Sequence, residues 1–396
     1  MRSRSLLALP LVAAALLVGG PLRAESGLRP ASQDADAPQH RRCKPCGTTG
    51  LVTCGDRAHK GVDLDLEGNL AYCSHVGDCD TCGGTGRVDC ERCERPDAAE
   101  RLGQMRARRD AARARHAELE AEVERSLPGG ESEHFRLIWD LESMKVGRKR
   151  LDRHELLHLF AERMEAVHAR YREVLKVEES AIPDRSAMAV WWLPTDHDDA
   201  ARRWCGGSAT MGVKRMGPKP FFSVCGNRSH FADDTDLHRY LVHNAAHLIL
   251  SNHTPQQWMG QFKGAAWYDE GLASWLETDL GGGAQTWCFQ EQDARGMWGG
   301  GKWRVALRKL VASEAAPSVA QVLQRDVNAL EMVEQAVAFS LIDHLIHRDA
   351  AALPELGRRL KKKEPVRDAL KEVYDLSPLT LERAWQAWVL ETYPKR

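Results

Sequence analysis

The segment Leu241-Val-His-Asn-Ala-Ala-His-Leu-Ile-Leu250 decides how this chain is interpreted. His243 and His247 are four residues apart. On a helix they share one face, at a spacing that lets two imidazoles bind one metal ion. The apolar residues around them predict a buried helix over 235–251. Because a buried histidine pair can also be a purely structural part of a core, a third ligand is needed to favour metal binding.

That ligand is found downstream, in Trp267-Tyr-Asp-Glu-Gly-Leu-Ala-Ser-Trp275. Glu270, on a second helix, would complete a set of two histidines and one carboxylate. Together the two segments resemble the gluzincin metallopeptidases, whose pattern is H-E-x-x-H followed by W-x-x-E-G-x-A. The resemblance implies that His243, His247 and Glu270 bind one zinc ion. It also implies a gluzincin-like domain over 131–396 with a mostly helical C-terminal half.

Asn244 departs from the family pattern at the position of the general base. In that family a glutamate takes a proton from the zinc-bound water, and an amide has no basic site for this step. Losing such a base typically costs ~10²–10⁴-fold in rate, so we expect a catalytically impaired protein. Ser274 stands where some members carry an acid that orients the first histidine. Asp269 and Glu277 are the nearest carboxylates, and we expect Asp269 to point elsewhere.

A second feature is a cysteine block, since eight of the 11 cysteines lie between Cys43 and Cys93. The segments 43–57 and 79–93 align as two copies of C-x-x-C-G-x-T-G-x-x-x-C. Paired thiols at a tight, glycine-containing turn suit a metal ion. Because two such thiols can also oxidise to each other in an exported chain, disulfides remain the alternative.

The block resembles the cysteine-rich zinc domain of DnaJ-type chaperones over residues 43–96, although no J-domain signature accompanies it. The resemblance implies one zinc ion on Cys43, Cys46, Cys90 and Cys93. It implies a second on Cys54, Cys79 and Cys82, where Arg57 replaces the fourth cysteine. The replacement ligand would be His59, Cys73 or His75.

The remaining cysteines carry less information. Cys205 and Cys225 flank a glycine-rich stretch and could form a disulfide, while Cys288 has no partner in any motif. A cysteine–histidine nucleophile pair has little support in the sequence. We therefore treat these three residues as lying outside the metal sites.

The N-terminus predicts export. Residues 1–24 read as a signal peptide, with Arg2 and Arg4 before an apolar run and Ala24 at the cleavage site. An uncleaved anchor is the alternative. Residues 25–42 form a polar linker, and 97–130 a solvated helical spacer that Pro128 and two glycines end. The expected location is the periplasm, the cell envelope or the exterior, with no membrane span after signal removal.

The expected fold is α+β: a small cysteine-rich zinc domain, a helical spacer and a gluzincin-like domain. Strands are predicted at 134–139, 187–193 and 221–225, and a helix at 152–177. With 55 basic and 56 acidic residues, the charge gives no case for nucleic-acid binding.

The predicted function is that of an exported, catalytically impaired metallopeptidase-like protein that binds zinc and polypeptide. One or two zinc ions belong to the cysteine-rich domain and one to the gluzincin-like site. The alternatives are an active zinc hydrolase with an atypical base, a structural envelope protein, and a relic in which the histidines are metal-free core residues.

Overall fold

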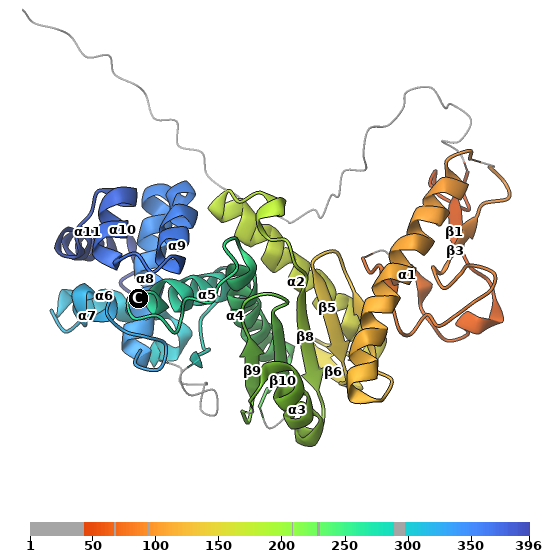
Figure 1. Ribbon diagram of the computed structural model, residues 1–396, viewed down its shortest axis with the longest axis horizontal. Coiled ribbons are helices and arrows are strands. Elements are labelled where there is room, and N and C mark those ends of the chain that lie inside the picture. The colour runs from red at the N-terminus through yellow and green to blue at the C-terminus, as the bar shows by residue number, and fades with distance from the viewer. Residues whose placement is uncertain (1–42, 67–68, 94, 208, 228–229, 289–297) are drawn as a thin grey trace, which may run out of the picture.

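The structure is a computed structural model that describes residues 43–66, 69–93, 95–207, 209–227, 230–288 and 298–396. The predicted signal peptide and linker lie outside these residues. The cysteine-rich segment and the first long helix lie at one end, a β-sheet in the middle, and a group of helices at the other end (Figure 1). The α+β class is confirmed.

The two cysteine repeats fold alike and pair with each other. β1 (Leu51–Thr53) and β3 (Arg87–Asp89) form an antiparallel ladder with one strand from each repeat. The threonine of each repeat explains the G-x-T-G pattern, because its hydroxyl donates to the carbonyl of the second cysteine. These bonds are 2.7 Å from Thr49 to Cys46 and 2.8 Å from Thr85 to Cys82. The hydroxyls thereby fix the turn that presents each pair of sulfurs.

Helix α1 (Ala98–Val123) occupies the predicted spacer, but it is not solvated along its whole length. Its start packs on β1 through Ala98 and Leu102. Midway, the buried guanidinium of Arg109 donates to the carbonyl of Gly77 at 3.0 Å. Near its end, Leu119 joins an apolar cluster under the central sheet. The predicted helix is therefore present, but one side of it packs against both parts that it connects.

The central sheet has six strands in the order β2-β4-β5-β8-β10-β9. Its parallel core is β5 (Phe135–Trp139), β8 (Ser186–Trp191) and β10 (Phe221–Cys225), which match the three predicted strands within two residues at each end. β4 (Gly129–Glu131) and β9 (Gly212–Arg215) flank this core, each antiparallel to its neighbour in the core.

The outermost strand, β2 (Tyr72–Cys73), comes from the cysteine block and pairs with β4. The cysteine block is thus continuous with the main sheet. Gly129 and Gly130, expected to end the preceding helix, instead form β4. A Cβ atom on Gly129 would lie 2.2 Å from the carbonyl oxygen of Leu137, so only glycine fits against β5 there.

Alternate residues of the parallel strands face two different cores. Leu137, Met188 and Phe222 face α2 (Arg153–Leu175) and α4 (Asp234–Asn252). Ile138, Ala189 and Phe221 face the layer that contains α3 (Pro194–Ala200). A hairpin of β6 (Ser143–Val146) and β7 (Lys149–Asp152) leads into α2. The helices predicted at 152–177 and 235–251 correspond to α2 and α4.

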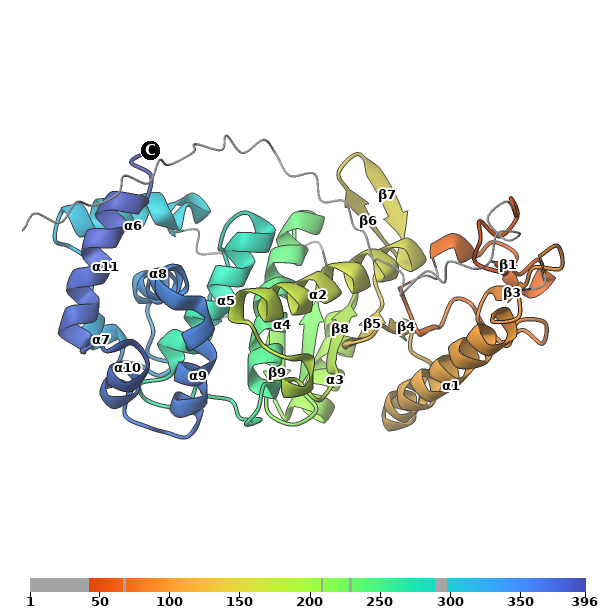
Figure 2. The ribbon, with the colours of Figure 1, turned by 90° about the horizontal axis from the view of Figure 1, so that it is seen from above.

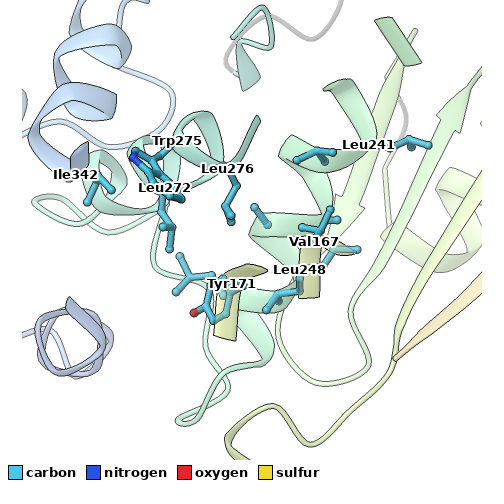
Figure 3. Packing of buried hydrophobic residues seen from close by; sticks show 14 of the residues in the cluster. Val167, Tyr171, Leu241, Leu248, Leu272, Trp275, Leu276 and Ile342 are labelled. Carbon is cyan, nitrogen blue, oxygen red and sulfur yellow. The ribbon is translucent and has the colours of Figure 1, made fainter. Parts of the chain in front are cut away.

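The C-terminal half is helical. It comprises α5 (Ala266–Gly281), α6 (Trp303–Ala312), α7 (Val319–Val322), α8 (Met332–Asp349), α9 (Leu353–Lys361), α10 (Val366–Tyr374) and α11 (Pro378–Thr392). α5 packs between α4 and α8, and Figure 2 shows the helices beyond it from above. Figure 3 shows the core in which Tyr171 and Leu248 pack near Leu272 and Leu276 of α5. Within the described residues, no helix is both long and apolar enough to cross a bilayer.

Candidate metal centres

Helices α4 and α5 bring together the three predicted ligands His243, His247 and Glu270. The two Nε2 atoms are 3.1 Å apart. The Glu270 carboxylate oxygens lie 3.5 Å from Nε2 of His243 and 3.6 Å from Nε2 of His247. All three side chains are buried.

A fourth side chain, Cys288, completes the cluster. Its sulfur lies 3.3 Å from Nε2 of His243 and 3.5 Å from Nε2 of His247. The four ligand atoms all lie within 4.8 Å of one another. Zinc bonded at 2.0–2.3 Å in a tetrahedron would separate its ligand atoms by about 3.3–3.8 Å. The observed distances between ligand atoms are close to these values, so the cluster has the size of a four-ligand metal site.

Two carboxylates orient the histidines through the Nδ1 atoms, which face away from the cluster. Nδ1 of His243 bonds to Glu277 at 3.1 Å, and Nδ1 of His247 bonds to Asp269 at 2.7 Å. Since each carboxylate accepts the Nδ1 proton, each Nε2 is left to face the metal position. The expectation that Asp269 points elsewhere is wrong. Ser274 has no carboxylate with which to orient His243. Glu277, one helical turn further along α5, forms that hydrogen bond instead.

Further hydrogen bonds hold these two carboxylates. Asp269 accepts a bond of 2.8 Å from the indole nitrogen of Trp258. Glu277 accepts bonds from the backbone nitrogen of Gln285, at 2.8 Å, and from the hydroxyl of Thr286, at 3.1 Å. These last two residues belong to the stretch that leads to Cys288. The Glu277 contacts therefore help to place the thiol as well as the histidine.

The charges of the cluster stabilise one another. Burial opposes charge on His247, but Asp269 and Glu270 outweigh it and raise the pKa of His247 to about 9. Burial likewise opposes charge on Glu270, yet His247 and His243 lower its pKa to about 2. The Cys288 side chain is half-buried and lies near Glu270, and both its desolvation and the charge of Glu270 raise its pKa. Lys214 and the two histidines nevertheless bring that pKa below its ordinary value.

Asn244, the residue that follows His243, is fully buried, and both the nitrogen and the oxygen of its amide form hydrogen bonds. Its nitrogen donates to the carbonyl of Tyr240 at 2.9 Å, and its oxygen accepts from the Lys214 ammonium at 2.9 Å. The same ammonium lies 3.1 Å from the sulfur of Cys288. Lys214, from β9, therefore links the substituted base position to the fourth ligand.

Cys288 and Lys214 were not predicted as site residues. Cys288 lies in a short turn outside any metal-binding motif, and Lys214 is a single basic residue on an edge strand. Neither has a spacing signal in the sequence. Only the tertiary structure brings them to the histidine pair.

The cysteine block forms two further clusters that could hold metal ions. In the first, Cys43 faces Cys90 at 3.6 Å and Cys46 faces Cys93 at 3.4 Å between sulfur atoms. A disulfide needs about 2.05 Å, whereas tetrahedral zinc thiolates would lie about 3.8 Å apart. These distances therefore favour metal binding over the disulfide alternative.

The second cluster contains Cys54, Cys79, Cys82 and His59. Nε2 of His59 lies 3.2 Å from the sulfur of Cys82, and the sulfurs of Cys54 and Cys79 are 4.0 Å apart. His59 lies in a short helical turn capped by Asp56. Of the three candidates for the fourth ligand, the structure brings His59 to this cluster and places Cys73 and His75 elsewhere.

The expected disulfide between Cys205 and Cys225 is not formed, because Cys225 is a free, buried thiol. The sulfur of Cys205 instead contacts the carbonyl oxygen of Val213 at 3.6 Å.

No protein-family model matches this sequence, and a comparison with curated proteins finds no relative. The two family resemblances therefore rest on the sequence motifs alone.

Proposed function

We propose that this chain is an exported, metallopeptidase-like protein that binds zinc and does not hydrolyse peptides at ordinary rates. The observation that carries the proposal is the position of Cys288. Catalytic zinc sites have three protein ligands and an open position for water, whereas structural sites have four protein ligands. The set His243, His247, Glu270 and Cys288 is of the second kind.

The donor types suit zinc. Two imidazole nitrogens, a carboxylate oxygen and a thiolate are all ordinary zinc ligands, and the mixture with sulfur disfavours magnesium and calcium. Zinc bound there would neutralise the charge of Glu270 and Cys288 within a buried core.

The chain's own residues also disfavour hydrolysis. A hydrolytic centre needs a group that takes a proton from water, and the Asn244 amide has no basic site. Lys214 donates a hydrogen bond to that amide and places its positive charge beside Cys288, which favours the thiolate form. An active hydrolase would need Cys288 to leave the metal and another residue to act as base.

The test is a peptide-library assay with zinc supplied. We expect no chelator-sensitive cleavage, and no difference between the wild type and His247→Ala. Cleavage at ordinary rates that is abolished both by chelator and by His247→Ala would refute the proposal and favour the hydrolase alternative.

We further propose that an unfolded polypeptide is the binding partner. A cavity of about 960 Å³ lies between the cysteine block, α1 and α2. Val52 and Met105 provide apolar lining, Arg101 a positive charge and Glu162 a negative one. Apolar walls with charges of both signs suit the mixed side chains and backbone of an extended polypeptide.

Fluorescence anisotropy with a labelled, permanently unfolded polypeptide tests this partner. We expect Val52→Glu and Met105→Glu each to weaken binding about tenfold while metal content stays unchanged. A matched control is Leu379→Glu, which alters a side chain that is 56% exposed on α11. Absence of binding by the wild type would favour a structural role in the cell envelope.

A further inference from the structure

A fourth cluster of metal-binding side chains lies where the cysteine block meets α2. Cys73 comes from β2, at the edge of the central sheet, and His154 and His158 come from the first two turns of α2. Their ligand atoms all lie within 4.8 Å of one another. The three residues are only 3%, 8% and 4% exposed.

This histidine pair has nearly the same geometry as the pair on α4. The Nε2 atoms of His154 and His158 are 3.1 Å apart, as are those of His243 and His247. The ring centroids are 4.8 Å apart in both pairs, with interplanar angles of 81° and 71°. In both cases residues four apart on a helix direct two Nε2 atoms toward one point.

A neighbouring side chain orients one of these rings. Nδ1 of His158 lies 2.7 Å from the amide oxygen of Asn69, which can only accept a hydrogen bond. His158 therefore carries its proton on Nδ1, and its Nε2 lone pair faces the cluster in the neutral ring. Metal-binding histidines characteristically form such a hydrogen bond through the ring nitrogen that does not bind the metal.

His75 stands beside the cluster, with Nδ1 3.8 Å from the sulfur of Cys73 and its ring centroid 5.0 Å from that of His154. It is partly exposed, unlike the other three residues. His75 is therefore a neighbour of Cys73 and His154, outside the compact set of three ligand atoms.

We propose that Cys73, His154 and His158 form an additional metal site for a borderline-soft divalent cation such as zinc, with His75 beside it. One thiolate and two imidazoles are sufficient protein ligands for such an ion. The site would join β2 to the start of α2 and so fasten the cysteine block to the main domain. It is independent of the function proposed for the α4–α5 cluster.

The test is the zinc content per chain, measured by elemental analysis of full-length protein purified under reducing conditions. Four equivalents are expected for the wild type: two in the cysteine block, one at α4–α5 and one here. The double variant His154→Gln/His158→Gln should lose one equivalent. His344→Leu, which alters another buried histidine, should lose none.

A conservative variant guards against misfolding. His158→Cys replaces one zinc ligand by another and should keep the equivalent that the double glutamine variant loses. His75→Ala should keep zinc but release it to chelator faster. If the double variant and the wild type hold equal zinc with equal resistance to chelator, the cluster is only a hydrogen-bonded histidine pair and the proposal is wrong.

Discussion

Asn244 and Cys288 are best understood together, because Lys214 contacts both of them. An asparagine alone at this position would leave a metal centre that still has room for water. With the Cys288 sulfur 3.3 Å from His243, that room is taken by a ligand. In our account two separate changes, a lost base and a gained ligand, close the site.

This account predicts how activity could be introduced. Asn244→Glu alone should stay inactive, because Cys288 still occupies the water position. Adding Cys288→Ala should allow chelator-sensitive peptide cleavage, since it opens that position while the new carboxylate supplies the base. General-base help is worth ~10²–10⁴-fold, so the double variant should exceed Cys288→Ala alone by a factor in that range.

Initial rates on the peptide library, with equal zinc content as the control, measure this effect. Equal, chelator-sensitive cleavage by Asn244→Glu and by the double variant would show that Cys288 does not block the metal, and absence of cleavage by the double variant would contradict the account.

Sequence reasoning found the members of the α4–α5 cluster that lie in motifs and missed the one that does not. His243, His247 and Glu270 follow from helical spacing and a short pattern. Cys288 is brought in by a turn whose position depends on the contacts of Glu277. Asp269 was misjudged because a linear pattern does not say which way a residue beside a ligand points.

At the scale of elements, Gly271 decides how closely α5 and α8 approach. A Cβ atom at this position would lie 2.6 Å from the carbonyl oxygen of Ala338 and 2.8 Å from the Ile342 side chain. The glycine next to Glu270 therefore has a packing reason that is separate from the metal.

We predict that Gly271→Ala lowers the free energy of unfolding by about 1–3 kcal/mol, because α8 must move away from α5. Gly103→Ala is the matched control, since it lies within α1 and has nothing within 4 Å of the added carbon. It should raise stability by about 0.5–1 kcal/mol. Urea unfolding of both variants measures the difference, and equal effects would contradict this explanation.

The elements predicted well are those with a regular spacing of apolar residues and clear capping residues at their ends. α2 begins with a capping box in which Asp152 and Glu155 bond to each other's backbone nitrogens, and its apolar spacing is regular. The short antiparallel strands β2, β4 and β9 are not predicted, because strands of two to four residues have too little periodicity and are defined by their pairing partners. Glycine at 129 and 130 signals a turn locally, and only contact with β5 makes it a strand.

At the scale of the whole molecule, buried histidines should make stability depend on pH. His344 is buried against Trp388, and neither of its ring nitrogens has a hydrogen-bond partner among the residues that the structure describes. Burial, together with the charges of Arg348 and His347, lowers its pKa from 6.5 to about 4.

The unfolded chain therefore binds a proton between pH 6.5 and about 4 that the folded chain does not bind. The stability from neutral His344 is present above pH 6.5 and is lost as the pH falls toward 4. At pH 5 the loss amounts to about 1–2 kcal/mol. His344→Leu should reduce by this amount the difference in urea stability between pH 7.5 and pH 5. An unchanged difference would show that His344 has the same pKa in the folded and the unfolded chain.

The architecture as a whole was predicted only in outline. The α+β class is confirmed, and the cysteine block forms clusters that could hold metal ions, but the block is continuous with the main sheet through β2. The spacing of the cysteines suggests a domain boundary at residue 96. It overlooks a two-residue strand and the packing of α1, which depend on tertiary contacts.

The central claim is that His243, His247, Glu270 and Cys288 form one closed metal centre, and cobalt substitution tests it most directly. The spectrum of the cobalt-loaded wild type minus that of His243→Ala/His247→Ala isolates this site from the cysteine clusters. We predict a thiolate-to-cobalt charge-transfer band in the difference spectrum, and its loss in Cys288→Ser. A difference spectrum with no thiolate band, or no difference in bound cobalt between the two proteins, would contradict the account.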